Sequence, residues 1–155
     1  MASFIGRFVN KVDRKGRVSV PARFRQVLAE HKCQDIIIFR SLEVDAIEAC
    51  TQPFMDRLIA GVGRAEQSVD GQNALSLALF GDVAEIPFDN EGRILLPGSL
   101  ASFASVTNTA AFIGRGEYFQ IWQPEALDSA MTAARTHAKS AGVSLLSLAR
   151  LGGQS

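Results

Sequence analysis

The sequence predicts an α+β protein in which two β-rich repeats of one motif are joined by helices and followed by more helices. Three observations lead to this prediction. A nine-residue motif occurs twice, 76 residues apart; strand-like runs surround each copy; and the segments between and after the copies carry apolar residues at helical spacing. With 155 residues, 47% of them hydrophobic and 21% charged, the chain can bury one sizeable core or two small coupled ones.

Both copies of the motif read Asp-x-x-Gly-Arg-apolar-x-apolar-Pro, the first over residues 13–21 and the second over residues 89–97. An Asp three positions before a Gly is typical of a tight turn. The carboxylate can accept backbone N–H groups, and glycine adopts a positive φ at little steric cost. We therefore predict one turn formed by Asp13 and Gly16 and a second formed by Asp89 and Gly92.

Strand-forming residues flank the first turn. Residues 8–12 precede it, and residues 17–20 follow it with Val18 and Val20 predicted to face the core. We expect these two strands and their turn to form a protruding two-stranded ribbon. Pro21 ends the second strand and suits the first turn of a helix, which is predicted over about residues 21–30. Its spacing places Phe24, Val27 and Leu28 inward and Arg23, Arg25 and Gln26 outward.

The same succession of elements continues in both repeats. Strand-like runs at 36–39 and 110–113 are each followed by a second strand that ends before Pro53 or Pro124, although the stretch 42–50 is acidic for a strand. Helices are predicted over 53–65 and 72–80, between the repeats, and over 124–138 and 143–151, after them. The predicted organisation is a first β-rich domain at 7–53, a helical connector at 54–82, a second β-rich domain at 83–126 and a helical tail at 127–155.

Charge is unevenly distributed along the chain, although the formal net charge is zero. Residues 1–40 carry nine basic and three acidic side chains, a net charge of +6, whereas residues 41–128 carry a net charge of −9 and residues 129–155 one of +3. A strongly basic segment favours an anionic partner such as nucleic acid. The alternative interpretation is a solvated basic face.

The basic side chains gather on the first turn and on the strands beside it. Arginine and lysine on a narrow β-ribbon can neutralise phosphates and reach base edges in a major groove. The second turn supplies one arginine beside Asn90 and Glu91, so the repeats are electrostatically unequal. The candidate DNA-binding residues are Arg7, Lys11, Arg14, Lys15, Arg17 and Arg93.

The sequence contains no Gly-x-Ser-x-Gly, His-Glu-x-x-His or Gly-x-x-x-x-Gly-Lys-Ser/Thr motif. His31 and His137 stand in no nucleophile, metal or phosphate-loop context, and Cys33 and Cys50 lack the spacing of a zinc site, so the cysteines are interpreted as small buried hydrophobes. We predict that the protein is not an enzyme and uses no cofactor, and no small-molecule ligand is evident from the sequence. No window has the roughly 18 uninterrupted apolar residues of a membrane helix, which favours a cytoplasmic protein.

The string from Asp13 to Arg25, together with its second copy at 89–97, resembles the MraZ family of bacterial transcriptional regulators. The resemblance extends over residues 4–138 and includes Tyr118–Trp122 at the end of the second repeat. It implies two fused SpoVT-AbrB-type, swapped-hairpin domains that form a pseudo-dimeric β-barrel with peripheral helices. It further implies a ring-shaped homo-oligomer. By position, Arg17 and Arg93, supported by Lys15, would be the leading DNA contacts.

The resemblance also implies a function. A protein of this kind is expected at the nucleoid, where it binds repeated boxes in double-stranded promoter DNA upstream of its own gene in the division and cell-wall gene cluster, mainly as a repressor. A hypothesis from another class stays open at this point. The basic face of a self-assembling scaffold or antitoxin-like module would bind an acidic protein instead of DNA. Salt-dependent binding that prefers intact repeats over scrambled DNA would separate the two.

Overall fold

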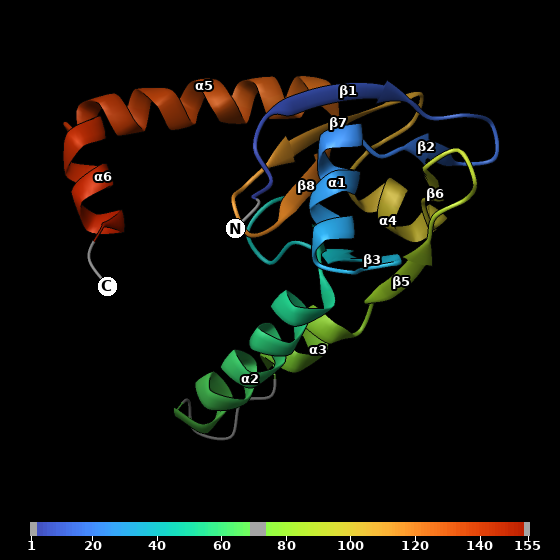
Figure 1. The fold of residues 1–155 in the computed structure, drawn as a ribbon, viewed down its shortest axis with the longest axis horizontal. Helices are drawn as coiled ribbons and strands as arrows, with labels where there is room; N and C mark the ends of the chain where they lie inside the picture. The colour runs from blue at the N-terminus through green and yellow to red at the C-terminus, as the bar shows by residue number, and fades with distance from the viewer. Residues whose placement is uncertain (1–2, 69–73, 154–155) are drawn as a thin grey trace. The chain divides into compact units, whose positions relative to one another are not determined.

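The computed structural model describes residues 3–68 and 74–153 of the chain (Figure 1). The chain divides into two compact units, one ending at Pro124 and one beginning at Glu125. The mixed α+β class predicted from the sequence is confirmed, with one large antiparallel sheet and several helices. The strands are β1 (Arg7–Lys11), β2 (Arg17–Ser19), β3 (Asp35–Arg40), β4 (Ile47–Cys50), β5 (Ala84–Pro87), β6 (Arg93–Leu95), β7 (Thr109–Gly114) and β8 (Phe119–Trp122). The helices are α1 (Ala22–Glu30), α2 (Gln52–Ser68), α3 (Ala74–Phe80), α4 (Gly98–Phe103), α5 (Pro124–Ser140) and α6 (Leu145–Gly152).

The large sheet interleaves strands from both repeats. Its six strands are ordered β1-β7-β8-β4-β3-β5, so the first strand of the chain pairs with β7 of the second repeat, with Phe8 opposite Phe112. At the centre, β4 of the first repeat pairs with β8 of the second, with Ile47 opposite Ile121. Neither repeat therefore completes a sheet by itself.

The two-stranded ribbon expected from β1 and β2 does not form. β1 pairs with β7, and β2 pairs with β6 of the other repeat in a separate two-stranded sheet. The segments on either side of the first turn form no regular ladder: they are joined by an isolated bridge between Val12 and Val18 and by hydrogen bonds from Asp13 N–H to the Arg17 carbonyl and from the Asn10 side chain to the Ser19 carbonyl. The physical reason is burial: pairing β2 with β6 places Val18 directly opposite Ile94, and each is only 1% exposed.

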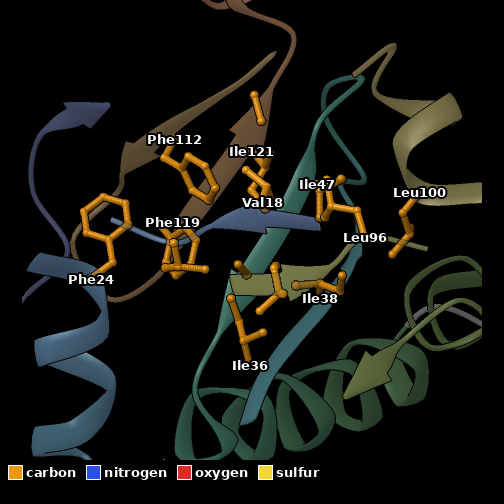
Figure 2. Close-up of a cluster of buried hydrophobic side chains, with 14 of the residues drawn as sticks. Val18, Phe24, Ile36, Ile38, Ile47, Leu96, Leu100, Phe112, Phe119 and Ile121 are labelled. Carbon is orange, nitrogen blue, oxygen red and sulfur yellow. The ribbon is translucent and has the colours of Figure 1, made fainter. Parts of the chain in front are cut away.

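One hydrophobic core serves both repeats. Phe24 of α1 packs against Phe119 of β8, with ring centroids 4.7 Å apart, and Phe4 lies 5.0 Å from Phe119. Figure 2 shows side chains from β2, α1, β3, β4, β7 and β8 pointing into this common space. The residues predicted to face inward are confirmed as buried: Val18, Val20, Phe24, Val27 and Leu28.

A smaller cluster lies between the sheet and the helices α2 and α3, which run side by side in Figure 1. Met55 and Val62 of α2 and Leu79 of α3 pack with Ile37 and Phe39 of β3. Cys50 joins this cluster fully buried, and burial raises the pKa of its thiol to about 12. The interpretation of this cysteine as a small buried hydrophobe is confirmed; Cys33 is half-buried.

The acidic stretch 42–50 does contain a strand, contrary to its unpromising composition. Ile47–Cys50 form β4 between β3 and β8. Ile47 and Ala49 are fully buried in the main core, and the free energy of burying them offsets the unfavourable effect of the acidic residues nearby. Residues 41–46 instead form the connection, in which Ser41 Oγ accepts hydrogen bonds from the backbone N–H groups of Glu43 and Val44. The predicted helix over 72–80 is observed from Ala74; residues 69–73 lie outside the described residues.

Glu48 of β4 places an ionisable carboxyl group in a largely buried position. Its Oε1 atom is buried and has no hydrogen-bond partner within the described residues. Burial raises the pKa of Glu48, and Gln120, which lies directly opposite, offsets part of that shift. A raised pKa means that the folded state holds the proton more tightly. The group therefore favours folding below its unfolded pKa, and that contribution is lost as the pH rises through the folded pKa.

Replacing Glu48 with glutamine should consequently stabilise the protein at pH 7 by up to about 1–2 kcal/mol, which corresponds to a rise in Tm of roughly 2–8 °C. The gain should vanish near pH 4, where the wild-type side chain is protonated in both states. Thermal unfolding of both proteins at several pH values measures this difference. Glu30→Gln, at an exposed position on α1, is the control. Equal Tm values for wild type and Glu48→Gln at pH 7 would contradict the expectation.

The C-terminal unit contains α5 from Glu125 onward and α6. The side chain of Ser144 caps α6 by accepting a hydrogen bond from the backbone N–H of Ser147 at 3.2 Å. Four leucines of α6 are more than half exposed: Leu145, Leu146, Leu148 and Leu151. In the described part of the chain, no helix combines the length and the apolar character needed to cross a bilayer.

Candidate nucleic-acid interface

The first turn is built around the carboxylate of Asp13. Its Oδ1 atom accepts hydrogen bonds from the backbone N–H groups of Lys15 at 3.0 Å and Arg17 at 2.8 Å. Gly16 donates its N–H to the Asp13 carbonyl at 3.0 Å and has a φ of +88°, in the region that favours glycine. The exposed loop is thereby held in one shape by bonds within five residues.

The second turn repeats this geometry almost atom for atom. Asp89 Oδ1 accepts from the N–H groups of Glu91 and Arg93, both at 2.9 Å, and Gly92 has a φ of +76°. The two turns therefore present the residues after them in the same way. They differ in the side chains at their tips: Arg14 and Lys15 in the first turn, Asn90 and Glu91 in the second.

Each turn aspartate also holds the arginine that follows it. Asp13 Oδ2 accepts from Arg17 Nε at 2.7 Å, and Asp89 Oδ2 accepts from Arg93 Nε at 2.8 Å. The backbone N–H of Arg17 is the largest cause of a lowered pKa at Asp13, and the hydrogen bond to Asp89 raises the pKa of Arg93. Both carboxylates are thus charged at neutral pH, where they orient the guanidinium groups.

The two arginines differ in which guanidinium nitrogens are still available to bind a ligand. The terminal amino groups of Arg17 make no hydrogen bond to another described residue, so they are free for a ligand. Arg93 Nη2 is paired with Glu91 Oε2 at 3.2 Å, and the negative charge of Glu91 lies beside it. The geometry therefore makes Arg17 the stronger candidate for binding an anion or a base edge.

The sheet of β2 and β6 brings the two arginines together. Antiparallel pairing sets Arg17 opposite Leu95, Val18 opposite Ile94, and Ser19 opposite Arg93. Because side chains alternate across a strand, the central pair points into the core and the two outer pairs share the outward face. The side chains of Arg17 and Arg93 are 37% and 27% exposed. Residues of two turns 76 positions apart thus share one small surface.

Backbone hydrogen bonds between the two repeats hold this sheet together at both ends. Leu96 donates its N–H to the Gly16 carbonyl at 2.9 Å, and Val20 donates its N–H to the Gly92 carbonyl at 3.2 Å. Each turn glycine therefore accepts from the strand that leaves the other turn. The arrangement relates the two motifs by an approximate two-fold axis through the pair Val18 and Ile94.

Arg25 reaches this surface although sequence periodicity only places it outward on α1. Its Nε donates to the Val20 carbonyl at 3.0 Å, and its guanidinium lies over Gly92, so close that a Cβ at that glycine would stand 2.7 Å from Nη1. A cation from the first repeat thus sits at the second turn, whose own tip has none. The equivalent position in the second repeat is Ala101, and no periodicity could have revealed the contact.

The remaining predicted residues lie around this surface. Arg14 and Lys15 are exposed at the tip of the first turn, next to Arg17. Arg7 and Lys11 are exposed on β1, which belongs to the six-stranded sheet, on the strand face opposite Phe8 and Val12. Asn10 connects the two sheets by donating to the Ser19 carbonyl at 2.7 Å. The structure therefore groups Arg14, Lys15, Arg17 and Arg93 and places Arg7 and Lys11 on a neighbouring strand.

Comparison with known proteins adds the following similarities. Residues 79–139 match the profile of a family described as "MraZ protein, putative antitoxin-like". A protein of Rickettsia felis named Transcriptional regulator MraZ is 34% identical over 135 residues, which cover 87% of this chain and 91% of that protein. Proteins of the same name from Rickettsia rickettsii and Rickettsia bellii are 35% identical over 135 residues and 36% identical over 126 residues. Those matches cover 87% and 81% of this chain and 91% and 84% of the relatives.

Proposed function

The chain belongs to the MraZ family, and from this premise we propose that it is a sequence-specific DNA-binding transcriptional regulator, acting as a repressor and not as an enzyme. The observation that supports the proposal most directly is the sheet of β2 and β6. A two-stranded β element is narrow enough to enter the major groove of B-DNA, and Arg can bond the O6 and N7 atoms of guanine there.

The proposed roles of the basic residues follow from their placement. Arg17 and Arg93, oriented by Asp13 and Asp89, would face base edges. Arg14 and Lys15, at the exposed tip of the first turn, would contact phosphates, and so would Arg7 and Lys11 on β1. Arg25 would support the second turn by its contact with Gly92.

For the finer fold, we propose that the two repeats form a pseudo-dimeric barrel of the SpoVT-AbrB, swapped-hairpin type. The reciprocal bonds from Leu96 to Gly16 and from Val20 to Gly92 support this, since they are what exchanged hairpins would make. The domain bounds that go with it are 7–53 and 83–126, with 54–82 as a connector and 127–155 as a helical tail.

A single surface of this size would bind DNA weakly, and the proposal therefore includes assembly. We propose that several chains form a ring-shaped homo-oligomer that binds direct repeats upstream of its own gene in the division and cell-wall gene cluster, in the cytoplasm at the nucleoid. Linked sites make each later contact effectively intramolecular, which multiplies a weak affinity.

The test is binding of the purified full-length protein to the DNA upstream of its own gene, compared with the same DNA carrying scrambled direct repeats, at two salt concentrations. We expect a preference for the intact repeats and an affinity that falls steeply with salt, because phosphate contacts release counterions. Equal binding to both duplexes, or none, would reject the proposal. It would then favour the alternative, in which the basic surface binds an acidic protein.

A further inference from the structure

The outward face of β2 and β6 carries two cross-strand pairs, Arg17 with Leu95 and Arg93 with Ser19. The approximate two-fold axis relates the two pairs, but the partner of the arginine differs between them. Ser19 and Leu95 occupy the same position in the two repeats, two residues after the motif arginine. The antiparallel register places Leu95 directly opposite Arg17 and Ser19 directly opposite Arg93. One arginine therefore stands beside an apolar side chain and the other beside a hydroxyl.

Burial in the core does not account for the leucine, whose Cδ1 atom lies only beside Gly16 of the first turn. Leu95 is 54% exposed, whereas its neighbours Ile94 and Leu96 are 1% and 4% exposed and supply the core contacts of this strand. Ser19 is also exposed, and its hydroxyl makes no hydrogen bond to another described residue; Asn10 binds its backbone carbonyl instead. Both side chains are thus available to a ligand that lies on this face.

The chemistry of the major groove distinguishes the two side chains. The 5-methyl group of thymine is the one apolar feature that a base pair presents there, and it is contacted by apolar side chains. Directly opposite residues on a sheet face have Cβ atoms about 4.5–5.5 Å apart, which lies between one and two times the 3.4 Å rise between base pairs. If Arg17 binds a base, a residue opposite it is therefore near enough to contact the neighbouring base pair.

Resting on the proposed function, we infer that Leu95 and Ser19 are specificity-determining residues of the DNA interface. Leu95 packs against the methyl group of a thymine adjacent to the base bound by Arg17. Ser19 binds a hydrogen-bonding group of the base adjacent to that bound by Arg93. The charges at the turn tips, Arg14 and Lys15 against Asn90 and Glu91, already make the two orientations on DNA unequal. The difference between Leu95 and Ser19 carries this asymmetry to the face that would meet the base edges, which suits direct repeats and not palindromes.

The experiment removes single methyl groups from the DNA. In the duplex upstream of the gene, each thymine of one repeat is replaced in turn by deoxyuridine, which lacks only the 5-methyl group. Dissociation constants are measured by fluorescence anisotropy for the full-length protein, for Leu95→Ser, and for Leu77→Ser as a control at a leucine that is 71% exposed on α3. Wild type and the control should lose about fourfold in affinity at one thymine, as expected for one buried methyl group.

Leu95→Ser should show no loss at that thymine, and Leu95→Asn should repeat this result with a second polar side chain. The inference is overturned if no deoxyuridine weakens the wild-type protein, or if Leu95→Ser loses as much as wild type. Both results leave DNA binding itself intact. Failure of the unmodified duplex to bind preferentially is a different outcome, because it rejects the proposed function and the inference with it.

Discussion

Replacing Arg17 with alanine is expected to weaken binding to repeat-containing DNA by roughly 5- to 150-fold for each site, the range for losing one bidentate contact to guanine. The loss should be larger in an oligomer that binds several repeats at once. The fold should persist, because Asp13 keeps its two backbone hydrogen bonds and Val18 keeps its place in the core when the guanidinium is removed. Affinity on the intact upstream duplex and circular dichroism measure the two parts of this expectation.

The matched control is Arg64→Ala, which removes the same charge from an exposed position on α2. Its affinity should stay close to that of wild type. Lys15→Ala separates phosphate contacts from base contacts, since it should lower the slope of log affinity against log salt by about 1 without changing the preference for intact repeats. Undiminished DNA binding by Arg17→Ala would place the interface elsewhere, and unfolding of that variant would make Arg17 a structural residue.

Truncating Phe119 to alanine is expected to destabilise the protein by about 3–5 kcal/mol, a large part of the 5–15 kcal/mol that holds a typical domain together. Phe119 is fully buried, and its ring lies 4.7 Å from that of Phe24 and 6.2 Å from that of Phe112. Phe24 belongs to the first repeat and Phe119 to the second. Both repeats should therefore unfold in one transition at lower urea concentration.

Urea unfolding followed by circular dichroism and by the fluorescence of Trp122 tests this. Trp122 reports on the second repeat, and circular dichroism reports on the whole chain, so coincident curves indicate a shared core. Leu77→Ala, at an exposed leucine of α3, should shift the midpoint little. If the two probes of Phe119→Ala gave separate transitions, the repeats would have independent cores, contrary to the packing seen here.

The local chemistry of the site could be predicted from the sequence alone. The turn bonds of Asp13 join residues two and four positions apart, and the spacing of Asp, Gly and Arg encodes them directly. The inward face of α1 is equally local, because Phe24, Val27 and Leu28 recur at helical spacing. The basic segment and the two motif arginines follow from the order of the residues in the same way.

Only the tertiary structure decided which strands pair. A local hairpin between β1 and β2 and an exchange between the repeats use the same strand-forming residues, and the exchange prevails because it buries Val18 against Ile94 in one common core. The contact of Arg25 with Gly92 and the position of Leu95 beside Arg17 are consequences of that exchange. The sequence by itself determined the two turns and their charges. Their meeting on one face depended on burial between residues 76 positions apart, which no local pattern records.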